Sequence, residues 1–211
     1  MPFTNVSLAS VLFGSYVLFW SAMAVSPIDW HSWALASVIP TVVVGGLVLA
    51  RRALALSKAS YLLIGAFIAL HTIGAHYTYA RVPLGDSLSS FLGNGRNDYD
   101  RIVHFAFGLL LAYPLQEVLA GFTNARGFLL YYVPSMTLVG LSGLWEVLES
   151  WVARIASPEL GAAYLGSQGD VWDAQNDIAA AFYGVLLWLT ISAWTRYRVA
   201  GHAVESPSPL T

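Results

Sequence analysis

The sequence predicts an all-α fold: one polytopic transmembrane bundle of about six helices, with both termini in the cytoplasm. Three observations predict it. Of the 211 residues, 57% are hydrophobic and only 10% are charged, whereas a soluble domain carries about 25% charged residues. The apolar residues gather in segments long enough to cross a membrane, and basic residues are concentrated in one set of loops. A chain with so few charges has lipid as its main solvent.

Six apolar segments are each close to the roughly 20 residues that a helix needs to cross the hydrocarbon core. Small residues within them, among them Gly65, Gly74, Gly108, Gly140, Gly143 and Gly184, permit close helix contact. We expect one domain over residues 1–200 and a disordered cytoplasmic tail at 201–211. The segments lie at about Val6–Val25, Ser32–Ala50, Ala59–Tyr79, Arg101–Ala120, Gly127–Ala153 and Trp172–Arg196.

The basic residues predict the orientation, because cytoplasmic loops carry an excess of Lys and Arg. If the amino terminus is inside, the loops after the second and fourth segments and the end of the sixth lie in the cytoplasm. These regions hold Arg51, Arg52, Lys58, Arg126, Arg196 and Arg198. The longer connections, at about 80–99 and 154–171, then lie outside together with most of the acidic residues.

Charge and cysteine content limit the partners. The net charge is −2, and there is no basic patch of the kind that a phosphate backbone requires, so we expect no nucleic-acid partner. The chain has no cysteine, and it therefore has no disulfide, no thiolate metal site and no cysteine nucleophile. Membrane lipids are the expected partners. The sequence does not predict an oligomeric state.

The third and fourth segments carry ionisable residues near their outer ends. The third ends with His71 and His76, and the fourth opens with Asp100 and His104, an i, i+4 pair on one helix face. A charge at the centre of a span costs about 2.5–3.5 kcal/mol and less toward the ends. Such side chains are therefore expected to point into the bundle, away from lipid.

The fifth and sixth segments bring further acids to the same level. The fifth carries Glu146 and Glu149 near its outer end, and the sixth begins with Asp173, Asn176 and Asp177. At 1.5 Å per residue, His104, Glu149 and Asp177 lie roughly 5–8 Å below the outer interface. Four helices therefore bring acids and imidazoles together at the outer side.

Four carboxylates in one small volume need a proton or a cation. We predict that His104, Glu149, Asp173 and Asp177 bind a divalent metal, and imidazole with carboxylate suits Zn, Mn or Fe. Two simpler interpretations remain open. Arg81 and Arg101 would neutralise two of the acids, or the acids would serve only helix association. In the same way, Arg96 with Asp98 would be only a solvated loop pair.

Four strings of this chain, taken together, resemble the YjdF-like bacterial inner-membrane proteins, a family known mainly as a domain of unknown function. The resemblance covers about residues 60–190 and implies a multi-pass protein of the bacterial inner membrane. Ser167 stands where the family pattern often has threonine. The strings are His76-Tyr-Thr-Tyr-Ala-Arg-Val-Pro83, Arg96-Asn-Asp-Tyr-Asp100-Arg-Ile-Val-His104, Trp145-Glu146-Val-Leu-Glu149-Ser-Trp151 and Leu165-Gly-Ser-Gln-Gly-Asp-Val-Trp172-Asp173-Ala-Gln175-Asn-Asp177.

A looser likeness is to the VanZ-like proteins, which also open a helix with the pattern seen at Asp100–Phe105. They later show an acidic residue that enters a helix of small residues, as Asp177 does here. This likeness implies a role that faces the cell envelope, and it supplies no reaction.

The leading hypothesis is a membrane-embedded, metal-dependent enzyme that acts on a lipid or lipid-linked substrate at the outer face. Glu149, Asp173 and Glu146 are the predicted catalytic residues, and Asp100 orients them. Arg81 and Arg101 would hold a phosphate head group. The turn Gly166-Ser-Gln-Gly169, with Gln168, and the nearby Asn176 would complete the substrate site. The alternatives are a lipid, proton or ion carrier and a non-catalytic membrane scaffold.

Overall fold

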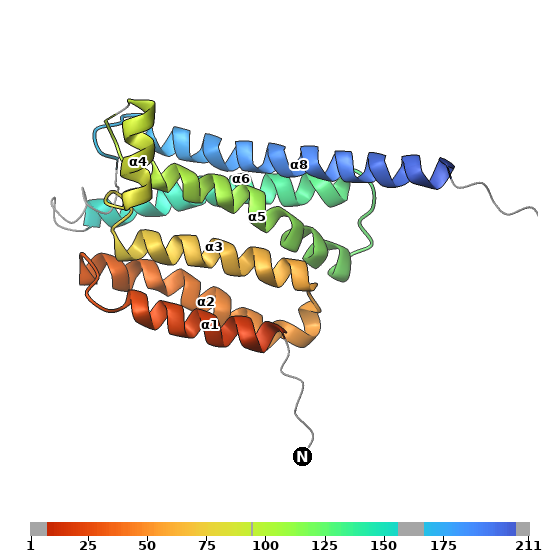
Figure 1. Cartoon of the computed structure of the whole chain (residues 1–211), viewed down its shortest axis with the longest axis horizontal. Helices are drawn as coiled ribbons and strands as arrows, with labels where there is room; N and C mark the ends of the chain where they lie inside the picture. Colours follow the sequence, from red (N-terminus) through yellow and green to blue (C-terminus); the bar gives the residue numbers. More distant parts are fainter. Residues whose placement is uncertain (1–7, 94, 156–166, 206–211) are drawn as a thin grey trace, which may run out of the picture.

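The computed structural model describes residues 8–93, 95–155 and 167–205, which form seven helices and no strand. The all-α prediction is therefore confirmed. The long helices run alongside one another, and the short α4 crosses one end of the bundle (Figure 1). The bounds are Leu8–Met23 (α1), Trp30–Leu54 (α2), Lys58–His76 (α3), Pro83–Leu92 (α4), Tyr99–Phe122 (α5), Leu129–Ile155 (α6) and Asp173–Glu205 (α8).

Four of these helices are long and apolar enough to cross a membrane: α2, α3, α5 and the part of α8 at Asp173–Arg198. The helix α1 is apolar but has only 16 residues, and α6 has 27 residues but is not among the four. Each expected segment overlaps one long helix, but the count of six spans is not confirmed. The helix α8 continues to Glu205, past the expected domain end, and residues 206–211 lie outside the described residues.

The helix α4 was not among the expected segments, because residues 80–99 were expected to form one of the longer connections. Its sequence does carry the signals of a short helix. Pro83 occupies the first helical position, and Gly93 ends the helix in the left-handed region at φ 69°. Ten residues are too few to cross a bilayer, so α4 stays at the end of the bundle.

The two glycines Gly108 and Gly184 bring the backbones of α5 and α8 into direct contact. A Cβ added to Gly108 would lie 2.0 Å from the carbonyl oxygen of Ala181, and one added to Gly184 would lie 2.1 Å from that of Phe105. Each helix therefore needs a residue without a side chain where the other crosses it. Beside this contact, Ala112, Leu138, Val185 and Trp188 form a buried apolar cluster.

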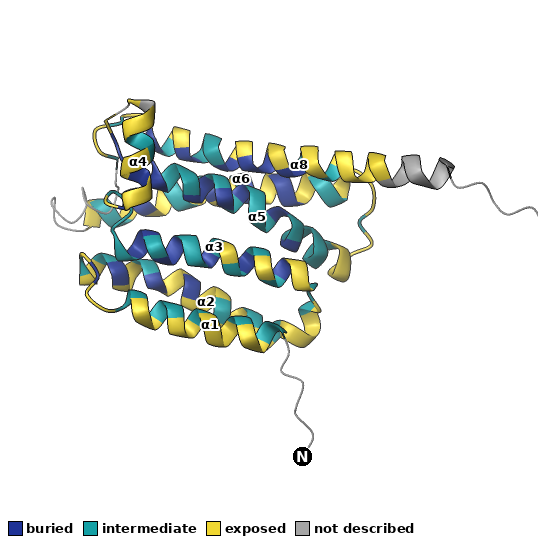
Figure 2. Cartoon of the chain, viewed as in Figure 1, coloured by how far each residue is buried: buried dark blue, intermediate teal, exposed yellow. Residues whose placement is uncertain are grey.

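The outward surface of the long helices is apolar. Figure 2 shows that exposed residues predominate on α1, α2 and the visible face of α8, whereas buried and half-buried residues concentrate on α3 and α5. Large hydrophobic side chains such as Leu18, Val42 and Leu49 are 74%, 67% and 88% exposed. Exposed apolar surface of this extent needs lipid to cover it.

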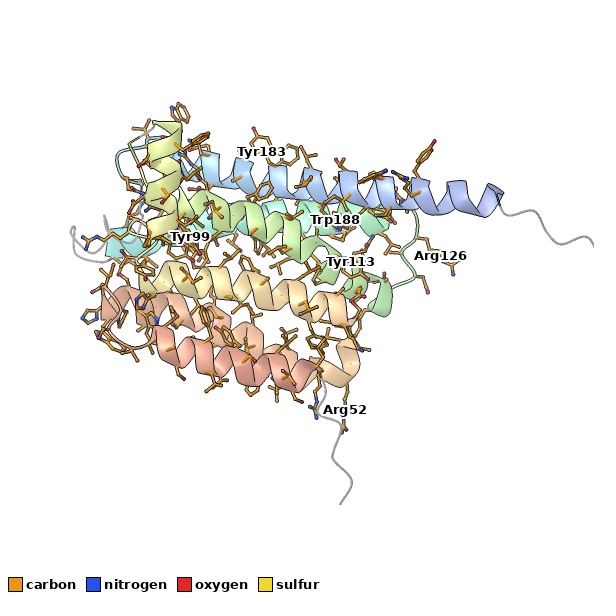
Figure 3. All side chains as sticks on the ribbon, in the orientation of Figure 1. Arg52, Tyr99, Tyr113, Arg126, Tyr183 and Trp188 are labelled. Carbon is orange, nitrogen blue, oxygen red and sulfur yellow. The ribbon has the colours of Figure 1, made fainter. Side chains whose placement is uncertain are left out.

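The two ends of the bundle differ in charge. Arg52 and Arg126 lie at one end, which we call the basic end, and Tyr99 lies toward the other (Figure 3). The opposite, acidic end is formed by the connections before α5 and α8 and by the first turns of both helices. At the basic end, Glu117 of α5 accepts hydrogen bonds from Ser57 N (3.0 Å) and Ser60 Oγ (2.5 Å), which fixes the start of α3.

Candidate functional site

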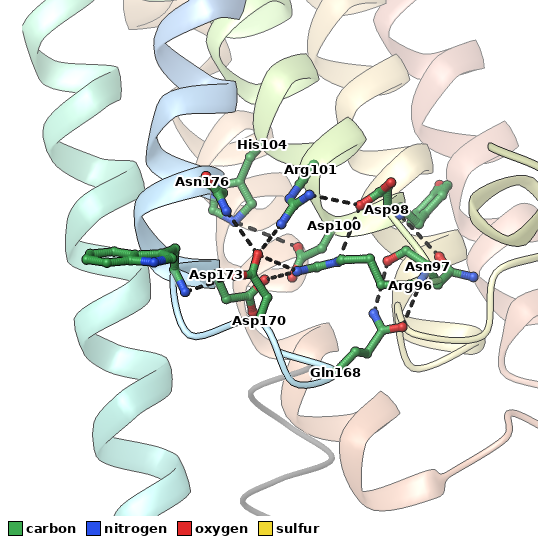
Figure 4. Close-up of polar contacts among 12 residues, drawn as sticks. Arg96, Asn97, Asp98, Asp100, Arg101, His104, Gln168, Asp170, Asp173 and Asn176 are labelled. Carbon is green, nitrogen blue, oxygen red and sulfur yellow. Dashed lines mark hydrogen bonds and ion pairs between the residues drawn. The ribbon is translucent and has the colours of Figure 1, made fainter. Parts of the chain in front are cut away.

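Arg96 is buried at the acidic end, where it pairs with acids from two separate parts of the chain (Figure 4). Its Nη1 is 2.5 Å from Asp173 Oδ1 and 3.2 Å from Asp170 Oδ2, and its Nε is 3.3 Å from Asp98 Oδ1. Burial acts to lower the pKa of Arg96, but the hydrogen bond and charge of Asp173 outweigh it, so this pKa is raised. Arg96 and Asp98 are thus a buried pair, and their interpretation as a solvated loop pair is wrong.

The connection before α5 is joined to the connection before α8 by paired amide hydrogen bonds. Asn97 N donates to Gln168 Oε1 (2.8 Å), and Gln168 Nε2 donates to Asn97 O (3.0 Å). Asn97 Nδ2 donates to Asp86 Oδ1 of α4 (2.7 Å). A Cβ on Gly85 would lie 1.8 Å from Asn97 Oδ1, so this approach requires glycine. Gln168 therefore holds the two connections together through its side-chain amide. Gly166, which was predicted to belong to the same turn, lies outside the described residues.

Asp170 contacts both Arg101 and Asn176, next to its ion pair with Arg96. Asn176 Nδ2 donates to Asp170 Oδ2 (2.9 Å), and Arg101 Nη2 forms an ion pair with the same oxygen. Arg101 Nη1 is also 3.1 Å from Asp98 Oδ1. The structure thus gathers Arg101, Gln168 and Asn176, whereas Arg81 is exposed and has no ion pair among the residues that are described. The predicted substrate-binding roles of all four residues stay predictions.

His104 is buried just inside this network, between α5 and α6. Its Nδ1 is 3.0 Å from Ser142 Oγ. Its Nε2 is 3.2 Å from Glu146 Oε1 and 3.7 Å from Asp100 Oδ1. The Glu146 contact has ion-pair distance but is not a well-aligned hydrogen bond. Two carboxylates therefore face Nε2, and the Ser142 hydroxyl faces Nδ1. In the neutral tautomer with the proton on Nε2, Nδ1 can accept a hydrogen bond from this hydroxyl.

Two further predicted acids lie buried in the bundle. Asp177 is 1% exposed, and Glu149 is 9% exposed. Asp177 Oδ1 has no hydrogen-bond partner within the described part of the chain. A buried carboxylate oxygen without a hydrogen bond is costly, and a membrane protein that retains one has a candidate functional site.

A cavity of about 480 Å³ lies between α2, α3, α5 and α6. Its lining is almost entirely apolar and extends from Tyr79 and Asp100 at the acidic end to Leu56 and Val118 toward the basic end. We call it the central cavity. Its few polar lining residues all lie toward the acidic end and are His71, Tyr79, Asp100, His104 and Ser142.

Both histidines of α3 are held by local hydrogen bonds. His71 Nε2 is 2.9 Å from the carbonyl of Ala36, so this nitrogen donates, and His71 Nδ1 accepts from the Tyr79 hydroxyl at 2.5 Å. His76 Nδ1 is 2.7 Å from the carbonyl of Met23. His71 therefore faces the central cavity as a fixed polar group, and His76 joins α3 to the end of α1.

The predicted metal site is not supported. His104 faces Glu146 and Asp100, whereas Asp173 pairs with Arg96. Over the described ranges, no group of three or more His, Asp or Glu side chains has an arrangement that could hold a metal ion. The cations Arg96 and Arg101 supply charge that we had expected from Zn, Mn or Fe. A bound metal stays a prediction, which elemental analysis of the purified protein tests.

The catalytic roles of Glu146, Glu149 and Asp173 also stay predictions. The sequence reasoning missed Ser142 and Tyr79, which line the central cavity beside the histidines. A signal for Ser142 was present, because it lies four residues before Glu146 and three residues before Trp145 on a helix with an acidic face. Tyr79 carried no such signal: it follows α3, and its backbone turns back in the left-handed region at φ 55°.

Comparison with known proteins confirms the resemblance drawn from the four strings. The model of a family described as "Predicted membrane protein (DUF2238)" matches residues 8–198. The chain is similar to "Inner membrane protein YjdF" of Escherichia coli (strain K12), with 34% identity over 164 residues, which cover 77% of this chain and 78% of that protein. No solved structure matches the chain.

Proposed function

The chain belongs to the DUF2238 family of predicted membrane proteins and is a multi-pass protein of the bacterial inner membrane, and from this premise we propose that it is a membrane-embedded enzyme for a lipid or lipid-linked substrate. The hydrocarbon chain of the substrate occupies the central cavity. Its polar part lies at the acidic end, beside His104, Glu146 and Asp100. Acid–base chemistry is then carried out where the chain joins the polar head.

The observation that carries this proposal is the polarity gradient of the central cavity. Its volume of about 480 Å³ falls within the roughly 300–1,000 Å³ of small-molecule sites. Apolar side chains line its length, and a histidine with two facing acids closes one end. A lipid has the same order of apolar chain and polar head, and lipid surrounds these helices.

The same gradient disfavours an ion or proton carrier. A carrier needs polar groups along its path across the membrane. Toward the basic end, the cavity is lined by side chains such as Leu47, Leu111, Leu115 and Val118. The polar groups of the cavity are concentrated at one end, as chemistry at one face of the membrane requires.

We further propose six membrane spans with both termini in the cytoplasm. The first residues of α1 and the end of α8 lie at the basic end of the bundle, with Arg52 and Arg126 (Figures 1 and 3). Basic loops favour the cytoplasmic side. Since the chain has no cysteine, single cysteines can report sidedness. An impermeant thiol reagent applied to intact spheroplasts should label Ser90→Cys and leave Ala55→Cys unlabelled; the reverse pattern would overturn the orientation.

Filling the central cavity tests the lipid site. Val43 of α2 lines the cavity and is 41% exposed, whereas its neighbour Val42 is 67% exposed and does not line the cavity. We expect Val43→Trp to lower crosslinking to a phospholipid with a photoreactive chain by about tenfold, which corresponds to ~1.4 kcal/mol. Val42→Trp is the matched control, with the same added volume on the outer face.

Crosslinked peptides should map by mass spectrometry to the cavity lining of α3, α5 or α6. Equal crosslinking of the two tryptophan variants and the natural chain would show that lipid contacts only the outer surface. In that case the central cavity does not hold the chain of a lipid, and the proposal fails.

A further inference from the structure

Ser142 occupies the position of a nucleophile at the polar end of the central cavity. It is 2% exposed to solvent and lines the cavity. Its Oγ lies 3.0 Å from His104 Nδ1, within the reach that a nucleophile and its general base need. A bound lipid chain would place the atoms at its polar end close to this hydroxyl.

The order of groups beyond Ser142 is that of a serine–histidine–acid relay. His104 is hydrogen-bonded to Ser142 through Nδ1, and its Nε2 is 3.2 Å from Glu146 Oε1. Ser142 and Glu146 are four residues apart on α6 and so share one helix face. The helix α6 therefore supplies both ends of the relay, and α5 supplies the imidazole between them.

The hydrogen bond of Ser142 differs from that of an ordinary buried helical serine. Ser135, on the same helix and 3% exposed, donates to the Tyr131 carbonyl four residues earlier at 2.7 Å, which is the usual local bond of serine in a helix. Ser142 Oγ instead meets an imidazole on another helix. A serine buried only for packing would need no more than a hydrogen bond to the carbonyl four residues earlier in its own helix.

We propose that Ser142 is the nucleophile of a Ser142–His104–Glu146 triad that cleaves or transfers the acyl group of a carboxylic ester in a lipid. This proposal rests on the lipid site described above and adds the reacting bond. Oγ of Ser142 attacks the ester carbonyl carbon while His104 Nδ1 takes its proton. Glu146 and Asp100, facing Nε2, stabilise the imidazolium.

The remaining steps return the enzyme to its starting state. The tetrahedral intermediate collapses, the bond from the acyl carbon to the alcohol oxygen breaks, and this oxygen takes the proton from His104. Water, or the hydroxyl of a second lipid, then attacks the acyl-Ser142 ester while His104 again accepts the proton. Release of the acyl group restores the Ser142 hydroxyl, and no oxidant or reductant is needed.

A long-chain alkyl fluorophosphonate tests the nucleophile, because it reacts covalently with an activated serine. We expect it to label the full-length protein in detergent or nanodiscs at Ser142, as mapped by mass spectrometry. Ser142→Ala should abolish labelling, and His104→Gln should slow it by about 10²–10⁴-fold, the usual contribution of a general base. Ser135→Ala, a buried serine of the same helix, should be labelled like the natural chain.

A cysteine in place of the serine gives a second measurement. In this cysteine-free chain, Ser142→Cys should be alkylated by a long-chain iodoacetamide faster than Ser135→Cys, because His104 promotes formation of the thiolate. Adding His104→Gln should remove the difference. Equal alkylation rates for the two cysteine variants would contradict activation by His104.

The outcomes separate this inference from the lipid site. If the natural chain is crosslinked in the central cavity but neither labelled by the fluorophosphonate nor activated as Ser142→Cys, the triad is wrong and the lipid site stands. If crosslinking does not depend on Val43, the lipid site itself fails. Labelling that persists in Ser142→Ala would place the nucleophile elsewhere and overturn the triad.

Discussion

Gly108→Ala should prevent α5 and α8 from packing as they do and should leave the protein strongly destabilised. The added Cβ would lie 2.0 Å from the Ala181 carbonyl oxygen and 3.0 Å from Val185 N. Both are backbone atoms, so no side chain can rotate away, and the helices must separate. We expect a loss of at least about 3 kcal/mol, the upper part of the range for overpacking substitutions.

Gly140→Ala is the matched control for this prediction. A Cβ at Gly140 meets nothing within 4 Å, and alanine is favoured over glycine in a helix by about 1 kcal/mol, so this variant should be as stable as the natural chain or more so. Thermal unfolding in detergent micelles, with the yield of folded protein from size-exclusion chromatography, measures both. Equal melting temperatures for Gly108→Ala and Gly140→Ala would show that α5 and α8 do not approach this closely.

Arg96→Met should cause the second large loss of stability. The substitution keeps much of the apolar stem but removes the cation that pairs with Asp173, Asp170 and Asp98. Removal of one partner of a buried ion pair costs about 3–5 kcal/mol, because the other charge stays buried. Arg81→Met removes an exposed arginine at the same side and should cost less than about 0.5 kcal/mol.

A double substitution identifies the cause of the Arg96 effect. If the cost comes from the unpaired Asp173 carboxylate, then Asp173→Asn combined with Arg96→Met should be less destabilising than the sum of the two single changes. Unfolding free energies of the four proteins, measured by denaturant titration in micelles, give the coupling. A coupling near zero, or an Arg96→Met variant as stable as Arg81→Met, would show that Arg96 does not hold the acidic end together.

The sequence does not show which of its small residues contact another helix. Gly108 and Gly184 belong to a set of small residues that also includes Gly65 and Gly140, and all of them are equally able to permit helix contact. The structure shows that the first two meet another backbone and that the other two meet nothing. Helix periodicity places a residue on a face, but only the packing partner decides whether a side chain fits there.

The candidate site shows the same division. The acids and imidazoles of α5, α6 and α8 were expected to gather at one level, and the structure places them there. Their partners were not evident from the sequence. Asp173 was expected at a metal and instead pairs with Arg96, which precedes it by 77 residues. Ser142 shares a helix face with Glu146 in the sequence, but only the structure shows that its hydroxyl lies beside His104.

By itself, the sequence determined that the protein is helical and membrane-embedded, and at which end its acids and histidines lie. Composition and the length of apolar segments decide these features, because each depends on the transfer of single residues or helices from water to lipid. Only the tertiary structure decided which charges neutralise one another, where the central cavity lies and which hydroxyl faces the imidazole. Those features depend on distances of a few ångströms between helices that are far apart in the chain. Local sequence patterns do not determine such distances.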